Sequence, residues 1–161
     1  MQRRSFITTV VASAGALGLG GARWAGRGHA AESFEVTRSE AEWKAMLTDL
    51  EYHVMREEGT ERAFTSPLDK LYDPGLYHCK GCDLALYSSE HKYDSGTGWP
   101  SFWKALPDAI GTKEDNTLFT TRTECHCRRC GSHLGHIFDD GPQPTGKRHC
   151  INGVSLTFKA A

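Results

Sequence analysis

The stretch CHCRRCGSHLGHIF (125–138) decides the expected fold, because it places a C-x2-C pair directly before a run of β-forming residues. A second pair, CKGC (79–82), precedes it by a long insert. Two such knuckles are typical of structural zinc with four thiolate ligands, here Cys79, Cys82, Cys127 and Cys130. The metal would stabilise the fold and take no part in catalysis. Two disulfides formed in an oxidising compartment are the alternative.

Two short helices are predicted ahead of these cysteines. Ser39 with Glu42, and Thr48 with Glu51, form capping boxes, each followed by apolar residues at helical spacing. Gly59 is expected to end the second helix. The positions expected to face the core are Trp43, Met46, Leu47, Leu50 and Val54.

From Leu76 onward, short runs of β-forming residues are broken by Gly, Pro and Asp, which predicts a mainly β fold, a small antiparallel, barrel-like domain. The runs are LYHC (76–79), LALYSS (84–89), TLFTTRTEC (117–125), GHIFDD (135–140) and RHCINGVSLTF (148–158). The segment DSGTGWPSFWKALP (94–107) contains too many Gly and Pro residues for a strand, and its two tryptophans indicate a binding loop.

The first 31 residues are predicted to be a targeting segment, and residues 32–161 one domain. Arg3 and Arg4 precede a small, apolar run, and the small residues near Ala30 and Ala31 suit cleavage. Paired arginines are typical of a twin-arginine signal, which exports folded proteins, so we expect a periplasmic or secreted protein. An uncleaved amphipathic arm is the alternative.

Charge and hydropathy narrow the possible partners of the remaining domain. Without the four arginines of the first 31 residues it has 15 Lys and Arg against 20 Asp and Glu, which argues against a nucleic-acid partner. No segment within it predicts a membrane span. We expect it to be a monomer.

Cys150 belongs to neither knuckle, and its surroundings indicate a reactive thiol. If residues 148–158 form one strand, alternate side chains share a face, so Arg148, Cys150 and Asn152 point inward together. A nearby guanidinium favours thiolate over thiol, which predicts a nucleophile. A structural buried cysteine is the alternative.

His133 and His136 follow the second knuckle and flank a Leu-Gly step. Because four cysteines complete the predicted zinc shell, these imidazoles are available for acid–base chemistry. Histidines with a purely structural role at the surface are the alternative.

Four motifs combine these residues into a known pattern: GTERAF (59–64), CKGC (79–82), KYDSGTGWPSFW (92–103) and the long stretch from TRTECHC to GVSLTF (121–158). Over about residues 36–159 the chain resembles the methionine-R-sulfoxide reductases, the MsrB family. The resemblance implies that Cys150 attacks the sulfur of the R epimer of methionine sulfoxide, in oxidised proteins or peptides, and becomes a sulfenic acid.

The resemblance also implies roles for the neighbouring residues. It implies a polar network around the sulfoxide oxygen, formed by His133, His136, Arg148 and Asn152. Trp99 would form an apolar wall for the methyl group. The four knuckle cysteines would hold structural zinc, and a thioredoxin-like donor would supply electrons.

Three positions depart from the commonest family pattern. Thr97 stands where many members carry a resolving cysteine, in the reading SGCGWPSF; His149 stands in place of a frequent tyrosine, and Gly153 in place of a frequent serine. Cys125 is the remaining thiol, and three roles stay open for it: resolving the sulfenic acid, filling space beside the zinc site, or acting as an alternative zinc ligand. Without a resolving cysteine an external thiol must reduce the sulfenic acid.

Two other functions fit some of these residues. A thiol–disulfide oxidoreductase of the cell envelope would use one C-x2-C pair as its redox centre and would bind no zinc. A non-catalytic zinc β-module would bind oxidised ligands in the Trp99 loop, and Cys150 would then be dispensable.

Overall fold

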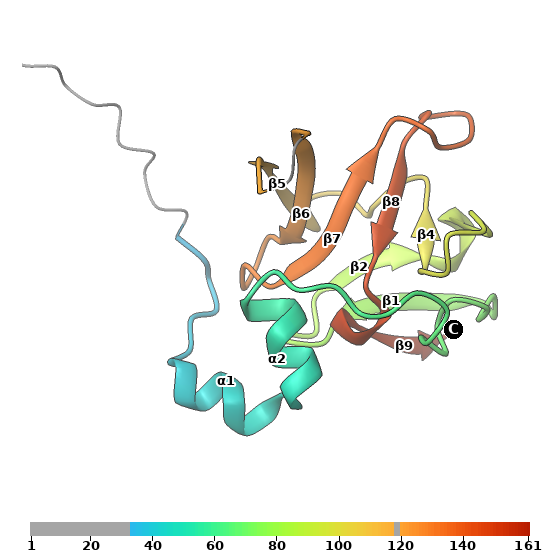
Figure 1. Ribbon diagram of the computed structural model, residues 1–161. Helices are drawn as coiled ribbons and strands as arrows, with labels where there is room; N and C mark the ends of the chain where they lie inside the picture. The colour runs from blue at the N-terminus through green and yellow to red at the C-terminus, as the bar shows by residue number, and fades with distance from the viewer. Residues whose placement is uncertain (1–32, 118–119) are drawn as a thin grey trace, which may run out of the picture. The chain divides into compact units, whose positions relative to one another are not determined.

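The computed structural model describes residues 33–117 and 120–161 (Figure 1). The chain divides into two units, Met1–Ala31 and Glu32–Ala161. The predicted export signal and its cleavage site therefore lie outside the described residues. In the part of the chain that the structure describes, no helix has the length and apolar character needed to cross a membrane.

Both predicted helices begin where their capping boxes place them. α1 (Glu40–Met46) follows Ser39, and α2 (Asp49–Arg56) follows Thr48. In each, the cap hydroxyl accepts a hydrogen bond from the amide three residues on, and the glutamate at that position accepts one from the cap amide. This exchange satisfies amides that the first turn of a helix leaves without partners.

The buried face of the two helices is narrower than predicted. Trp43, Leu47 and Val54 are buried, but Met46 and Leu50 remain 44% and 49% exposed. The expectation was wrong for the last two, because helices of about two turns each bury only a narrow stripe of side chains against the sheets.

The second helix also ends earlier than predicted. Its last residue is Arg56, Glu57 is the C-cap, and Glu58 takes a left-handed conformation with φ of 57°. A Cβ at Gly59 would lie 2.4 Å from the ring of His53, so a side chain there would require that ring to move.

Two antiparallel sheets form the framework of the described domain, and more of its residues lie in strands than in helices, which confirms the predicted mainly β class. The three-stranded sheet has the order β2-β1-β9 and consists of β1 (Gly75–Cys79), β2 (Ala85–Ser88) and β9 (Leu156–Ala160). The larger sheet has the order β3-β4-β8-β7-β6-β5. Its strands are β3 (Lys92–Tyr93), β4 (Ser101–Phe102), β5 (Ile110–Asp115), β6 (Arg122–Cys127), β7 (His133–Phe138) and β8 (Arg148–Ile151). The short 3-10 turns are η1 (Ser89–His91) and η2 (Gly153–Ser155).

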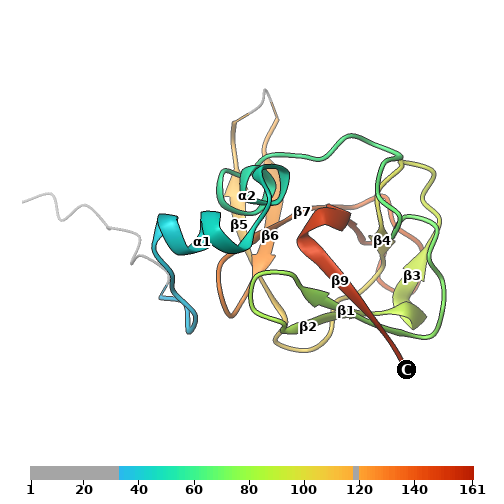
Figure 2. The same cartoon turned by 90° about the horizontal axis from the view of Figure 1, so that it is seen from below.

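Aromatic side chains join the two sheets. The ring of Phe102, on β4, lies 5.0 Å from the ring of Tyr77, on β1, and 4.4 Å from that of Tyr87, on β2. All three rings are fully buried, as are Leu134 and Ile151. Seen from below, β1, β2 and β9 run side by side (Figure 2). This core fixes the position of β8, which carries Cys150.

The continuous strand predicted at 148–158 is wrong. β8 ends at Ile151, η2 follows, and the chain then enters β9 in the other sheet. Arg148 and Cys150 therefore share a face of β8, but the residues after Ile151 do not extend that face. Two smaller boundaries also differ: β6 begins at Arg122, and the 94–107 loop contains the short strand β4.

A buried carboxylate explains the break after β8. Glu61 accepts hydrogen bonds from the amides of Gly153 and Val154, so these amides are not free to pair with a neighbouring strand. A Cβ at Gly153 would lie 1.8 Å from the Ser66 hydroxyl oxygen, so a larger residue at this point would require Ser66 to move. A contact across more than 90 residues of sequence thus overrides the β propensity of this segment.

Candidate active site and metal centre

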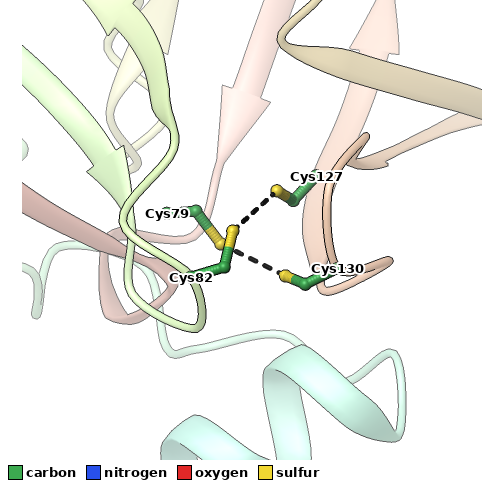
Figure 3. A group of neighbouring side chains, drawn as sticks. All are labelled: Cys79, Cys82, Cys127 and Cys130. Atoms are coloured by element: carbon green, nitrogen blue, oxygen red, sulfur yellow. Dashed lines mark hydrogen bonds between the residues drawn. The ribbon is translucent and has the colours of Figure 1, made fainter. Parts of the chain in front are cut away.

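Four cysteines meet at the ends of two hairpin turns (Figure 3). Their sulfur atoms lie within 4.8 Å of one another. The Sγ atoms of Cys79 and Cys130 are 3.6 Å apart, and those of Cys82 and Cys127 are 3.5 Å apart. A tetrahedral zinc ion with Zn–S bonds of ~2.3 Å would separate its sulfurs by ~3.8 Å, so the group fits a metal with four thiolate ligands.

The same distances bear on the alternatives for these cysteines. All six cysteines of the chain are free thiols in the structure, which does not show the two disulfides considered above. Cys125 is not a member of the group of four. Among the residues that the structure describes, the group that could hold a metal consists of the four cysteines that the sequence predicts.

Cys150 lines a cleft of about 140 Å³ on one face of the large sheet. The cleft contains three of the predicted catalytic residues besides Cys150, and its full lining is Thr60, Trp99, Arg122, Gly135, His136, Phe138, Cys150 and Asn152. His133 and Arg148, which are also predicted catalytic residues, do not line the cleft. The cleft therefore combines a thiol, an imidazole and aromatic walls.

Strand register explains why His136 faces Cys150. The two residues are directly opposite each other in the β7–β8 pair, and Phe138 is opposite Arg148. Directly opposite residues project to the same face. Gly135 allows β7 and β8 to approach, since a Cβ there would lie 2.0 Å from the Cys150 carbonyl oxygen.

The thiol of Cys150 is less acidic than its sequence neighbours predict. Burial raises its pKa, while the charge of Arg148 and hydrogen bonds from Thr97 and Arg148 lower it, and the net pKa lies above the ordinary value. The Thr97 Oγ1 atom is 3.9 Å from the sulfur. Burial therefore outweighs the guanidinium, and the shift in the Cys150 pKa is opposite to the one expected from Arg148 alone.

Arg148 is positioned by two other residues. Its Nε and Nη2 atoms each donate a hydrogen bond of 2.8 Å to the carboxylate of Asp140. The guanidinium also lies 4.4 Å from the centroid of the Phe138 ring. Arg148 thus places a positive charge near Cys150 while its guanidinium is paired with the Asp140 carboxylate.

The two histidines are each held by a carboxylate. The His136 Nε2 atom lies 2.7 Å from Asp115 Oδ2, and the His133 Nδ1 atom lies 2.6 Å from Glu124 Oε1. Burial lowers the pKa of His136 below its ordinary value, with Asp115 acting in the opposite direction. The two rings are 5.4 Å apart.

Glu124 anchors a second histidine as well. Its other oxygen lies 2.9 Å from His126 Nδ1. Burial opposes ionisation, but the hydrogen bonds from His126 and His133 lower the pKa of Glu124 to about 2. The His133 Nε2 atom is buried and has no hydrogen-bond partner among the described residues.

Asn152 and Trp99 are fixed through the Glu61 main chain. Asn152 Oδ1 accepts from the Glu61 amide at 2.9 Å, and its Nδ2 donates to the Leu134 carbonyl at 3.1 Å. The indole Nε1 of Trp99 donates to the Glu61 carbonyl at 3.1 Å. The polar edge of the indole is therefore satisfied, and the ring is free to act as an apolar wall.

Cys125 lies on the opposite face of the large sheet from Cys150. It is opposite Gly135 in β7, which is opposite the buried Ile151 in β8, and successive strand residues point to opposite faces. Cys125 is fully buried, and its sulfur lies beside Tyr87. Two strand spacings separate the two cysteines, about 10 Å, against the ~7 Å limit for a disulfide.

Several residues of the site received no role from the sequence. They are Glu61, Asp115, Arg122 and Glu124. Arg122 and Glu124 lie in the quoted motif TRTEC, so the motif marked them without assigning a function. Asp115 reaches His136 only because β5, β6 and β7 are neighbours, and single-sequence patterns do not reveal such a contact.

Comparisons with known proteins point to one family. A SelR domain matches residues 47–160. The peptide methionine sulfoxide reductase MsrB of Methanosarcina barkeri is 54% identical over 125 residues, which cover 77% of this chain and 88% of that protein. The MsrB proteins of Leptospira interrogans and Agrobacterium fabrum are each 48% identical, over 79% and 78% of this chain and 98% and 93% of theirs. A solved structure titled "Crystal Structure of Mis18 'Yippee-like' Domain" aligns with a TM-score of 0.43 and 15% identity over 55% of this chain and 98% of that one, too low to carry an argument.

Proposed function

Because the chain belongs to the MsrB family of peptide methionine sulfoxide reductases, we propose a reaction in which Cys150 attacks the sulfoxide within the cleft that it shares with Trp99 and His136. The protein is a peptide-methionine (R)-S-oxide reductase and reduces methionine sulfoxide in proteins or peptides. The observation that carries the mechanism is the position of the Cys150 thiol, opposite an imidazole and beside an aromatic wall.

The proposed step transfers one oxygen and two electrons. The Cys150 sulfur attacks the substrate sulfur, the S–O bond of the substrate breaks, and the oxygen is transferred to the Cys150 sulfur. The bond between the two sulfurs breaks as the thioether leaves, so Cys150 becomes a sulfenic acid. Thiol and sulfoxide are both neutral, and so are sulfenic acid and thioether. The proton that leaves the thiol therefore ends on the transferred oxygen, and His136, opposite Cys150, is placed to carry it.

The cleft offers a separate contact to each substituent of the sulfur. Trp99 receives the methyl group, His136 receives the oxygen, and Cys150 approaches from a third direction. Three fixed contacts distinguish the two epimers at sulfur, because exchanging methyl and oxygen would place the polar atom against the indole.

We propose that a thioredoxin-like dithiol restores the enzyme. One thiol attacks the sulfenic sulfur and releases water, and the second then displaces Cys150 as a thiol. The support for an external donor is the position of Cys125, which lies on the other face of the sheet. A resolving role for Cys125 would require β7 to separate from its neighbours.

We propose that the four clustered cysteines hold zinc. The supporting observation is the closely spaced set of four sulfurs, which matches a closed tetrahedral shell. Bound zinc would supply a structural link between the turns after β1 and β6, with no open position for substrate. The same grouping disfavours a thiol–disulfide oxidoreductase, because neither pair is left available for redox exchange.

We also propose that the domain is exported as a folded monomer to the periplasm or beyond. The support is Arg3 and Arg4 followed by a small, apolar run and by small residues near Ala30 and Ala31. Replacing both arginines with lysine should leave the protein in the cytoplasm, as cell fractionation can measure. Export of that variant at the normal rate would exclude the twin-arginine route.

Separated epimers of methionine sulfoxide test the catalytic proposal. The protein with a dithiol reductant should turn over the R epimer, and Cys150→Ser should abolish this while retaining one zinc per chain. Turnover of the S epimer alone would refute the assignment. Insulin reduction by the Cys150→Ser variant would instead support the oxidoreductase alternative.

A further inference from the structure

Arg122 is a cationic wall residue of the cleft that the reaction described above does not use. It lines the cleft together with Cys150 and His136, and its side chain is 26% exposed. The Nε atom is buried and has no hydrogen-bond partner among the residues that the structure describes. A buried donor without a partner is costly and rare, so it indicates a place where a ligand or water binds.

One carboxylate oxygen holds Arg122 beside His136. Asp115 Oδ2 accepts a hydrogen bond of 2.5 Å from Arg122 Nη2 and lies 2.7 Å from His136 Nε2. The other oxygen of Asp115 accepts from the amide and hydroxyl of Thr117. The guanidinium is therefore fixed next to the imidazole that faces Cys150.

The charge balance favours a neutral acceptor. Because Asp115 already neutralises Arg122, the pair attracts a free carboxylate only weakly. A sulfoxide has no net charge, but its oxygen is strongly polarised and becomes more negative as the S–O bond breaks. A fixed N–H beside that oxygen gains strength during the reaction.

Two of the donors predicted from the sequence, Arg148 and Asn152, are already engaged. Arg148 donates two hydrogen bonds to Asp140, and Asn152 uses its amide on the main chain of Leu134 and Glu61. Arg122 is thus the cationic member of the cleft lining whose Nε–H is buried and unpaired among the described residues.

We propose that Arg122 is a catalytic residue whose Nε–H donates a hydrogen bond to the substrate sulfoxide oxygen, beside His136. This inference rests on the proposed function of the cleft. Removing the donor should slow oxygen transfer more than it weakens substrate binding, because the bond is strongest in the transition state.

Single-turnover kinetics measure this directly, because they exclude the recycling step. Arg122→Met should reduce the rate of sulfenic acid formation roughly 100-fold. Arg122→Lys keeps the charge beside Asp115 but lacks the Nε donor, so most of the loss should remain. Lys44→Met, which removes an exposed charge on α1, is the matched control and should retain full activity. Thermal unfolding and zinc content report whether each variant is folded.

A binding experiment separates contact with oxygen from a structural role. In the Cys150→Ser background, the ligands are N-acetylmethionine-(R)-sulfoxide methylamide and the corresponding thioether, which share every peptide carbonyl. Arg122→Met should weaken the binding of the sulfoxide roughly 10-fold and leave the affinity for the thioether unchanged. In Cys150→Ser protein that retains Arg122, the side-chain ¹⁵N–¹H resonance of Nε should shift with the sulfoxide only, which decides the question even if the methionine variant does not fold.

The outcomes are distinct. Equal weakening of both ligands, or an Nε resonance that does not respond to the sulfoxide, would overturn the role of Arg122 while leaving R-epimer turnover by the unmodified enzyme intact. If the unmodified enzyme reduces neither epimer, the proposed function fails, and the role of Arg122 fails with it.

Discussion

A cysteine at position 97 should trap oxidised Cys150 as a disulfide. The Thr97 Oγ1 atom is 3.9 Å from the Cys150 sulfur, and a cysteine there would place its own sulfur in nearly the same position. A disulfide needs the two sulfurs ~2.05 Å apart. Rotation of the side chain in a loop between Gly96 and Gly98 can supply this approach, because both glycines have positive φ.

The stabilisation follows from the length of the loop that the bond closes. The two positions are 53 residues apart, for which the chain-entropy relation gives about 4 kcal/mol. For a domain of about 130 residues this corresponds to a rise in Tm of about 15 °C between the reduced and oxidised forms of Thr97→Cys.

Mass spectrometry after one equivalent of substrate provides the assay. Thr97→Cys should lose the mass of water from its sulfenic acid and gain a 97–150 crosslink, and its oxidised form should show the higher Tm. Thr97→Ser, which keeps a hydroxyl but cannot crosslink, should stop at the sulfenic acid, as should the natural sequence. Failure of Thr97→Cys to crosslink, or a Cys125–Cys150 crosslink in the natural sequence, would refute the geometry described here.

Three further predictions concern stability. A strong chelator, or Cys79→Ser, should unfold the domain as seen by circular dichroism, because a metal held by the four cysteines would link the turns after β1 and β6; an unchanged Tm after complete metal loss would contradict this. Burial and the charge of Lys147 lower the pKa of His149 to about 4, below its ordinary 6.5. The neutral His149 therefore contributes fully to the free energy of unfolding above pH 6.5, and this free energy falls by about 3 kcal/mol as the pH falls towards 4, because the unfolded chain binds the proton first. Denaturant titrations at pH 7 and 4.5 should show that the free energy of unfolding of His149→Phe lacks this fall. If the variant and the natural sequence show the same acid dependence, His149 is not its cause. Gly135→Ala should destabilise the domain by several kcal/mol, because its Cβ would clash with the Cys150 carbonyl oxygen at 2.0 Å; an unaffected Tm would mean that β7 and β8 can separate at no cost.

The features that the sequence predicts well are those encoded over a few residues. Both capping boxes begin helices where their Ser and Thr residues stand, because a cap needs only a hydroxyl and a glutamate three positions on. The cysteine pairs likewise indicated a common metal site, since C-x2-C spacing by itself forms half of a tetrahedral shell.

The features that it does not predict depend on contacts across the fold. Glu61 breaks the strand predicted after Ile151. Nothing in the sequence near position 153 indicates that the carboxylate of a residue just after α2 will bind there. The Cys150 pKa shows the same limitation. Arg148 is two residues away in sequence and lowers it, but burial by distant residues has the larger effect.

The metal centre and the cleft are connected through β7. Cys127 ends β6 and Cys130 lies in the turn that leads into β7, and the amide of Cys127 donates to the Ser132 carbonyl. Three residues after Cys130 the chain reaches His133, and His136 follows opposite Cys150. A metal held by these sulfurs would fix the start of β7 and hence the register of His136, although it touches neither substrate nor thiol. Loss of metal should therefore abolish oxygen transfer before global unfolding is complete, because an error of one residue in the β7–β8 register would turn His136 to the other face.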